Sequence, residues 1–381
     1  MKKIYYWSPC LANIGTVRST INSAISLSKY SNSKYEVYLI NSCGEWNNYE
    51  KICLENNIKL INLTFNYYKF LPKKGFLLSR ISYLIVFFVS YFPFINILKK
   101  NNPNFVICHL ITSLPLLAML LYETNTKFIL RISGYPKLNI LRKKFWKICS
   151  KKLYKITSPT IDLIDQIKKE NIFKKDSLSF LPDAVLNIKS IIEQKKNIKK
   201  RIINKNEKYF ISVGRLTEQK NFVYLIKEFE KFSKINNEYN LHIYGEGEQF
   251  QTLENLILNK NLQKRIFLKG FSKEIYLEMS KAKCFLMSSL WEEPGIVLIE
   301  AAFNNLFIIS SNCKNGPKEF LMNGEAGILF ESNRNDALFN KLIEYQKMET
   351  LERKKKIFKA KYNCGKYTMF KHFIRIDKIL D

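Results

Sequence analysis

Charged side chains in the segment FISVGRLTEQKNF (210–222) have types and a spacing that suit a diphosphate. Arg215 follows a strand-like run, with Gly214 at the turn, and Lys220 lies near the start of the next helical run. Such a strand–loop–helix turn exposes backbone N–H groups at the positive end of a helix dipole. Arg215 can bind two phosphate oxygens at once, and Lys220 adds a compact positive charge. The alternative is that both are ordinary surface charges of a βα loop.

Two glutamates in SSLWEEPGIVLIEAA (288–302) suit a ligand with several hydroxyl groups. Glu292 falls in a loop after a strand, and Glu300 falls two turns into a helix that we expect Pro294 to start. One carboxylate can bind a sugar ring and the other a ribose, and Gly295 permits a close backbone approach. An unpaired carboxylate in an apolar helix is costly, so we expect Glu300 to have a partner. A capped helix with one solvent-facing glutamate is the alternative.

Short β-rich runs alternate with helical runs in both halves of the chain. The expected strands are 2–7, 35–40, 58–63, 104–109, 127–132, 154–159, 178–182, 208–214, 239–245, 265–270, 283–289, 306–311 and 326–330. This alternation is typical of parallel sheets with helices on both faces.

Two such sets predict an α/β protein with two doubly wound, Rossmann-like domains. We place the N-terminal domain at residues 1–185 and the C-terminal domain at 205–350. We expect closing helices at 351–381 to pack back on the N-terminal domain.

The composition of the 381 residues is that of a soluble, globular protein, with 46% apolar and 25% charged residues. It excludes a disordered chain, a collagen-like chain and a polytopic membrane protein. Sixty-two Lys and Arg against 33 Asp and Glu give a formal net charge of +29, which favours anionic partners. Part of this excess also fits the composition of AT-rich bacterial genomes. No nucleic-acid-binding module is present, so we expect no nucleic-acid partner.

Cysteine and aspartate usage argues against a disulfide framework and against a metal site. The eight cysteines contain no C-x-x-C pair and several lie in apolar runs, which is typical of buried free thiols in a reducing cytoplasm. No Asp precedes Asp162, and none of the seven Asp residues forms an Asp-x-Asp pair. We therefore expect no metal and no other cofactor.

The run 81–98 holds eighteen residues without a charge, close to the length of a membrane span. It lies between two strands that require a crossover helix, and Pro93 is expected to interrupt it. We therefore favour a helix with one face in the core and the other on an anionic membrane surface over a transmembrane span. The segment 141–155 adds seven positive charges and no acid. That segment alone fits a solvated basic helix equally well.

The order and spacing of several segments resemble family 4 of the glycosyltransferases. These segments are GRLTEQKNF, LHIYGEGEQFQTLENLI, the Glu292-x7-Glu300 pair, NGPKEFL and AGILF. The resemblance covers about residues 205–345 and is looser in the N-terminal half. It implies a retaining enzyme with two facing Rossmann-like domains, the GT-B architecture, and in detail it resembles bacterial O-antigen and capsule transferases.

The resemblance also implies roles for individual residues toward a UDP- or GDP-linked sugar, which is a substrate. Arg215 and Lys220 would bind its diphosphate, Glu300 its ribose, and Glu292 would face the sugar and share in catalysis with these two cations. The remaining donor-binding residues implied are Gly15, Thr16, Gly214, Pro294, Gly295 and Ile296. The transfer would proceed without a metal.

One departure from the family pattern concerns the N-terminal domain. Many members carry a histidine at the end of a strand there, whereas this chain has Ser133 and Gly134 in LRISGYP. His109 closes another strand of that domain and is the one histidine near the expected cleft; a structural strand-end histidine is the alternative. His109, Ser133 and, by position, Arg131 and Lys137 are our acceptor-side candidates.

These observations predict transfer of a hexose or amino-hexose to an acceptor linked to polyprenyl diphosphate or to a growing surface polysaccharide, such as O-antigen, lipopolysaccharide or capsule. We expect the protein on the inner face of a bacterial inner membrane. The alternative is a catalytically silent, nucleotide-binding scaffold of a polysaccharide assembly complex.

Overall fold

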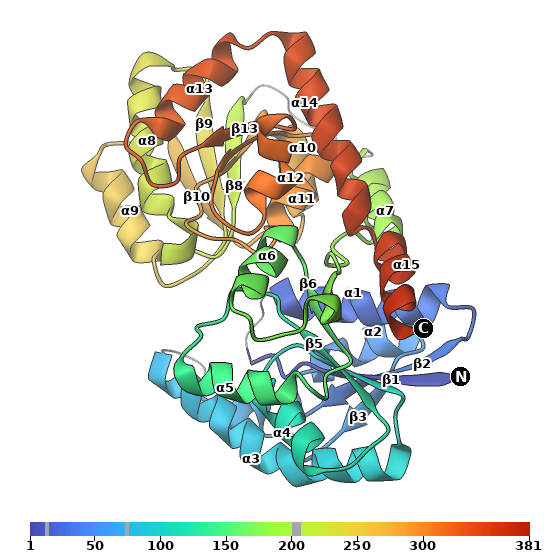
Figure 1. Ribbon diagram of the computed structural model, residues 1–381. Coiled ribbons are helices and arrows are strands. Elements are labelled where there is room, and N and C mark those ends of the chain that lie inside the picture. The colour runs from blue at the N-terminus through green and yellow to red at the C-terminus, as the bar shows by residue number, and fades with distance from the viewer. Residues whose placement is uncertain (12–14, 73–75, 200–206) are drawn as a thin grey trace. The chain divides into compact units, whose positions relative to one another are not determined.

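The computed structural model describes residues 1–11, 15–72, 76–199 and 207–381, and its chain divides into two units (Figure 1). Unit 1 comprises Met1–Val185 and Tyr367–Asp381, and unit 2 comprises Leu186–Lys366. The expected start of the C-terminal domain at residue 205 lies outside the described residues. The expected closing segment is divided between the units. Its first helix packs within unit 2 and its last helix within unit 1.

Unit 1 is built on a seven-stranded parallel sheet with the order β3-β2-β1-β4-β5-β6-β7. Its strands are β1 (Lys2–Trp7), β2 (Tyr35–Asn41), β3 (Lys59–Asn62), β4 (Phe105–Cys108), β5 (Lys127–Arg131), β6 (Lys155–Ser158) and β7 (Leu178–Phe180). Alternate residues of β1 enter different cores, because successive side chains of a strand point to opposite faces. Tyr5 and Trp7 pack on one face of the sheet, and Ile4 and Tyr6 on the other.

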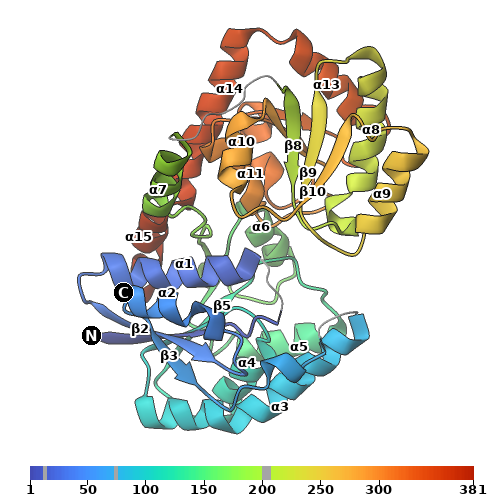
Figure 2. The same cartoon turned by 180° about the vertical axis from the view of Figure 1, so that it is seen from behind.

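Helices cover both faces of this sheet (Figures 1 and 2). The helices of unit 1 are α1 (Gly15–Tyr30), α2 (Glu50–Glu55), α3 (Phe76–Asn101), α4 (Ser113–Leu121), α5 (Ile140–Cys149), α6 (Ile161–Lys169) and α15 (Met369–Leu380). Residues of α1, α2 and α15 share one core with the sheet, and residues of α3, α4, α5 and α6 share the other. The last helix, α15, lies against α1, so the C-terminus completes the first unit.

Unit 2 contains a six-stranded parallel sheet with the order β10-β9-β8-β11-β12-β13. Its strands are β8 (Tyr209–Val213), β9 (Asn240–Tyr244), β10 (Ile266–Gly270), β11 (Cys284–Met287), β12 (Phe307–Ser311) and β13 (Ile328–Phe330). Its helices are α7 (Ile188–Lys199), α8 (Phe222–Ile235), α9 (Phe250–Asn259), α10 (Ile275–Lys281), α11 (Ile296–Phe303), α12 (Pro317–Phe320), α13 (Ala337–Lys347) and α14 (Thr350–Asn363). All thirteen expected strands are therefore confirmed.

The order of strands reverses once in each sheet. In unit 2 the chain moves outward from β8 through β9 to β10, then returns beside β8 with β11 and continues to β13. In unit 1 the same reversal lies between β1 and β4. Loops at the carboxyl ends of two such strands diverge and leave room for a ligand. The two pairs of loops are thus the natural binding positions of the two units.

Two expectations about proline are wrong. Helix α3 continues through Pro93, with Phe94 and Leu98 of its second half packed in the core of unit 1. Pro294 does not start α11, which begins at Ile296, because Gly295 has a left-handed φ of 86° and separates the proline from the helix.

Candidate functional site

The loops after β8 and β11 of unit 2 carry the charged residues singled out in the sequence. Arg215 follows β8 and is exposed, and Lys220 ends the short 3₁₀ turn Glu218–Lys220 before α8. Glu292 lies in the loop after β11, and Glu300 in the second turn of α11. Because β8 and β11 are neighbours at the strand reversal, their two loops meet at one edge of the sheet.

Glycine lets the turn after β8 pack against the turn after β9. Gly245, after β9, has a φ of 142°, and a Cβ on it would lie 1.8 Å from the backbone oxygen of Gly214. The turns after β8 and β9 can therefore pack together only without side chains at this point. A Cβ on Gly214 would in turn meet the side chain of Lys220 at 3.2 Å. The predicted donor residue Gly214 thus leaves room for the lysine.

Lys220 and Glu292 form an ion pair between the two loops. The carboxylate is 4% exposed, and Ser289 Oγ donates a second hydrogen bond of 2.6 Å to the same oxygen. A buried carboxylate without such partners would cost stability. The pair also places a cation beside the carboxylate predicted to face a sugar.

Hydrogen bonds to backbone oxygens fix the two loops to each other. Leu290 N donates to Gln219 O at 2.8 Å, and the Gln219 side-chain amide donates to Trp291 O at 2.9 Å. Ser288 Oγ donates to Lys220 O at 2.8 Å. The loop that carries Lys220 is therefore fixed directly to the loop that carries Glu292, which gives the ion pair a defined position.

Glu300 has the partner that its apolar surroundings demand. It is 4% exposed, and the hydroxyl of Tyr276 in α10 donates to Glu300 Oε1 at 2.8 Å. A hydrogen bond from a neighbouring hydroxyl restricts the rotamer of the carboxylate, which can accept several hydrogen bonds in all. Tyr276 is thus suited to orient Glu300 toward the ribose hydroxyls for which we predict it.

Replacement of Tyr276 by phenylalanine should weaken UDP binding about 5–10-fold, because Glu300 loses the bond that orients it. Binding of 2′,3′-dideoxy-UDP should be unchanged, since that ligand lacks both ribose hydroxyls. Calorimetric titration of both ligands checks this. Tyr244→Phe is the matched control, because its hydroxyl bonds to Glu278 of the same unit at 3.0 Å. An equal loss for both ligands would show that Tyr276 acts on the fold alone.

The N-terminus of α11 and the loop after β12 complete this edge of unit 2. The backbone N–H groups at the start of α11, from Ile296, follow Pro294 and Gly295 in the chain. A Cβ on Gly316 would lie 2.3 Å from Pro294 O, so the two loops pack closely. Asn315 Nδ2 also donates to Glu293 Oε1 at 3.2 Å. The edge therefore combines a helix N-terminus with the charged residues described above.

Of the predicted donor and acceptor residues of unit 1, Gly15, Thr16 and His109 lie beside its strand reversal, whereas Arg131, Ser133 and Lys137 lie at or after the end of the next strand, β5. Gly15 and Thr16 start α1, which follows β1, and His109 directly follows β4. His109 is buried, with Nδ1 at 3.3 Å from Thr20 Oγ1. Burial, together with the nearby Arg131, lowers the pKa of His109 to about 3, so its imidazole is neutral.

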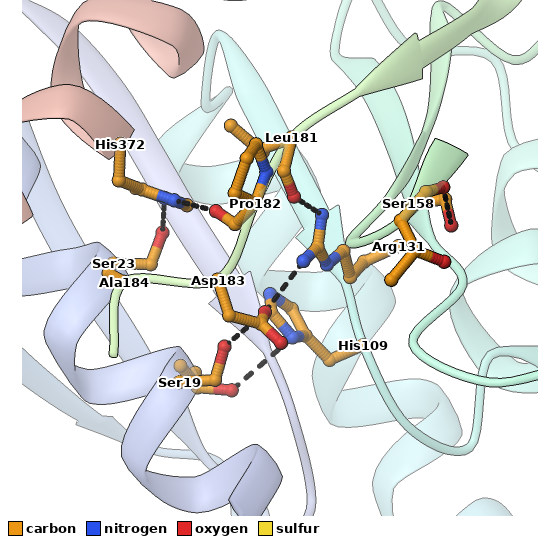
Figure 3. Close-up of polar contacts among 12 residues, drawn as sticks. Ser19, Ser23, His109, Arg131, Ser158, Leu181, Pro182, Asp183, Ala184 and His372 are labelled. Carbon is orange, nitrogen blue, oxygen red and sulfur yellow. Dashed lines mark hydrogen bonds and ion pairs between the residues drawn. The ribbon is translucent and has the colours of Figure 1, made fainter. Parts of the chain in front are cut away.

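Arg131 does not have the accessible position expected of an acceptor ligand (Figure 3). Its side chain is 2% exposed, and Nη2 forms an ion pair of 2.6 Å with Asp183. Nη1 donates to Leu181 O at 2.6 Å, and Ser19 Oγ donates to Asp183 at 2.5 Å. Contrary to the expected role, the guanidinium is therefore fully engaged inside unit 1. Of the other candidates, Ser133 is half-buried and Lys137 exposed.

His372 of α15 joins the same buried region to the segment that precedes residue 185 (Figure 3). Its Nδ1–H donates to Pro182 O at 2.7 Å, and Nε2 accepts from Ser23 Oγ at 2.7 Å. This pattern fixes a neutral tautomer, and burial lowers the pKa of His372 to about 4.

Unit 1 should lose stability as the pH falls below about 6.5. The folded pKa values of His109 and His372 are lowered, so the unfolded chain binds more protons between pH 6.5 and these values. Each histidine then costs about 1.4 kcal/mol per pH unit. Urea unfolding followed by tryptophan fluorescence, at pH 7 and pH 5, measures the loss. His372→Asn should remove about half of it, and an unchanged pH dependence in that variant would contradict the assignment.

Three residues that build these sites were not singled out in the sequence. Tyr276 and Ser289 support the glutamates of unit 2, and Asp183 pairs with Arg131. Only Ser289 could have been found from the sequence, since it ends the expected strand 283–289 shortly before Glu292. Within the described ranges, no group of three or more His, Cys, Asp or Glu side chains is arranged to hold a metal ion, and all eight cysteines are buried free thiols.

The sequence of residues 193–363, nearly all of unit 2, matches the family described as glycosyl transferases group 1. This match to the family lies within the second unit of the chain. The resemblance drawn from the motifs around Arg215 and Glu292 is thereby confirmed. Since the matched region contains every charged residue of the unit 2 site, the family match and the site rest on the same part of the chain.

Two curated glycosyltransferases and a solved structure extend the comparison. An uncharacterised glycosyltransferase of Methanocaldococcus jannaschii is 31% identical over 246 residues, which cover 60% of this chain and 61% of that protein. A second relative, from Campylobacter jejuni, is the N-acetylgalactosamine-N,N'-diacetylbacillosaminyl-diphospho-undecaprenol 4-alpha-N-acetylgalactosaminyltransferase. It is 25% identical over 269 residues, which cover 70% of this chain and 69% of that protein. The chain thus spans about three-fifths to two-thirds of these relatives. The Staphylococcus aureus TarM complex with UDP superposes with a TM-score of 0.73 at 15% identity and 100% coverage of both chains, which confirms the GT-B fold class.

Proposed function

We propose that this protein is a retaining, metal-independent glycosyltransferase that moves a hexose or amino-hexose from a UDP- or GDP-sugar. The observation that carries the proposal is the Lys220–Glu292 ion pair between the two loops at the strand reversal of unit 2, with the exposed Arg215 on the first of these loops. Glu300 lies in the helix that follows the second loop. Cations beside a buried carboxylate suit a ligand that joins a diphosphate to a sugar.

The chemistry required of these residues is stabilisation of a leaving group. Cleavage of the sugar–phosphate bond leaves negative charge on the nucleoside diphosphate, and positioned cations and helix N–H groups stabilise that charge. Arg215 is exposed, and Lys220 is held beside Glu292. We propose that Lys220 shifts part of its interaction from Glu292 to the diphosphate, while Glu292 accepts from sugar hydroxyls. Retention would follow from attack on a short-lived oxocarbenium ion at the face of the leaving group.

For the acceptor, we propose a saccharide linked to polyprenyl diphosphate or a growing surface polysaccharide. The support is the printed name of the Campylobacter relative, which acts on a diphospho-undecaprenol-linked sugar. A lipid-linked acceptor would place the enzyme on the cytoplasmic face of the inner membrane. His109, Ser133 and Lys137 remain acceptor-side candidates.

A donor panel tests this function. The protein is incubated with UDP- and GDP-linked hexoses and amino-hexoses, with and without a short polyprenyl-diphosphate-linked saccharide, and release of the nucleotide is measured. We expect one donor to turn over and the release to increase with the acceptor, whereas Glu292→Gln should abolish it. Binding of nucleotide without turnover of any donor would instead support the scaffold alternative.

A further inference from the structure

Helix α3 presents an unusual distribution of side chains to its two sides. The positions that face the core of unit 1 are Ser82, Val86, Ser90, Phe94 and Leu98, all 1% exposed or less. The opposite positions are large and apolar. They are Ile81, Leu84, Phe88 and Phe92, exposed by 48%, 57%, 69% and 73%. The helix is therefore apolar on both sides, and its exposed side carries larger apolar residues than the buried side needs at Ser82 and Ser90.

This exposed stripe follows helical spacing and is long. Its members lie three or four residues apart, so they share one side of α3 over about three turns. Only 28% of the most apolar stretch of α3, within Leu78–Asn101, is buried. Soluble proteins rarely expose a continuous apolar surface of this kind unless it contacts a partner or a membrane.

The charges around α3 indicate which kind of surface its exposed side contacts. Residues 56–161 contain seventeen Lys and Arg and a single acid, Glu123. Lys99 and Lys100 are exposed at the end of α3. Helix α5 lies in the same helical layer, since α4 contacts both, and it exposes Lys144 and Lys147. An apolar stripe among lysines fits an anionic lipid surface, in which acyl chains meet the rings and headgroups meet the cations.

We propose that α3 lies in the plane of an anionic membrane and inserts the stripe Ile81–Leu84–Phe88–Phe92 below the headgroups, with α5 supplying charge. The helix does not cross the bilayer, because its inner side packs against the sheet of unit 1. This surface is separate from the charged residues of unit 2. Membrane contact is therefore independent of glycosyl transfer and can be tested without it.

Co-sedimentation with vesicles tests the inference. The full chain is mixed with vesicles of phosphatidylcholine alone or with 40 mol% phosphatidylglycerol, at about 0.1 M and 0.5 M salt. We expect binding to the anionic vesicles, weakened by salt, and at least a tenfold loss of partitioning for F88D/F92D. The matched control is F358D/Y362D on α14, which has the same i,i+4 spacing and exposures of 71% and 78%. It should bind like the wild type.

Other outcomes would overturn the inference. Absence of binding by the wild type, or equal loss in both double variants, would do so. A change from dimer to monomer in F88D/F92D, seen by light scattering without vesicles, would assign the stripe to a second copy of the chain. UDP titration of F88D/F92D reports whether unit 2 remains intact, so failure of this inference and failure of the proposed transfer are distinguishable. Near-ultraviolet circular dichroism verifies that unit 1 stays folded.

Discussion

Replacement of Lys220 by alanine is expected to lower the rate of sugar transfer about 10²–10³-fold, the effect of removing one positioned group that stabilises developing negative charge. The variant loses a cation proposed to meet the leaving diphosphate. It also leaves Glu292 buried without its ionic partner, held by Ser289 alone among the described contacts. The first consequence acts on the transition state, whereas the second also lowers the stability of unit 2, because a buried carboxylate loses its counter-charge.

Steady-state rates of nucleotide release, at saturating donor, measure this effect. Lys227→Ala is the control, because Lys227 is an exposed lysine of the helix that follows, α8. It should retain the wild-type rate. A thermal unfolding scan of both variants separates loss of chemistry from loss of structure. A Lys220→Ala enzyme within threefold of the wild type would exclude this lysine from leaving-group stabilisation.

Replacement of Asp183 by alanine should destabilise unit 1 by about 3–5 kcal/mol, because it leaves the buried guanidinium of Arg131 without a counter-charge. The side chains of both partners are nearly inaccessible, at 2% and 6% exposure. Three of the four tryptophans, Trp7, Trp46 and Trp146, are buried in unit 1. Tryptophan fluorescence during urea unfolding therefore reports this unit.

The control for Asp183 is an exposed aspartate of the same unit. Asp165 pairs with Lys168 on the surface of α6, and its removal should change stability by less than about 0.5 kcal/mol. Joint replacement of both buried partners, Arg131→Met with Asp183→Leu, should recover much of the loss, since no unpaired charge remains. A small effect of Asp183→Ala would mean that water reaches Arg131 in solution.

The strands were predictable because each is a short apolar run bounded by turn residues, and parallel strands buried on both faces have little other freedom. The charged loops were predictable for a related reason. Arg215 and Glu292 lie in the loops after β8 and β11, so the sheet order alone brings their loops together. The unit against which α14 packs was less predictable, because its amphipathic pattern fits either unit equally well.

Pairings between distant segments were not predictable. Arg131 looked available as a basic residue at a strand end, but Asp183, 52 positions later, neutralises it. Tyr276 contacts Glu300 across 24 residues and from a helix with no motif of its own. Such contacts depend on side-chain geometry between elements, which a pattern of residue types along one chain does not encode. A helix at 81–98 with one face in the core was expected, but which of its apolar residues are exposed was visible only in the structure.

The most direct measurement is calorimetric titration of the full chain with UDP and with GDP, repeated on Arg215→Ala. One of the two nucleotides should bind to a single site, and the variant should weaken it at least tenfold, because Lys220, the other cation of the loop after β8, is paired with Glu292 and offers no second guanidinium for the two phosphate oxygens. Failure of both nucleotides to bind, or undiminished binding by Arg215→Ala, would contradict a donor site at the strand reversal of unit 2.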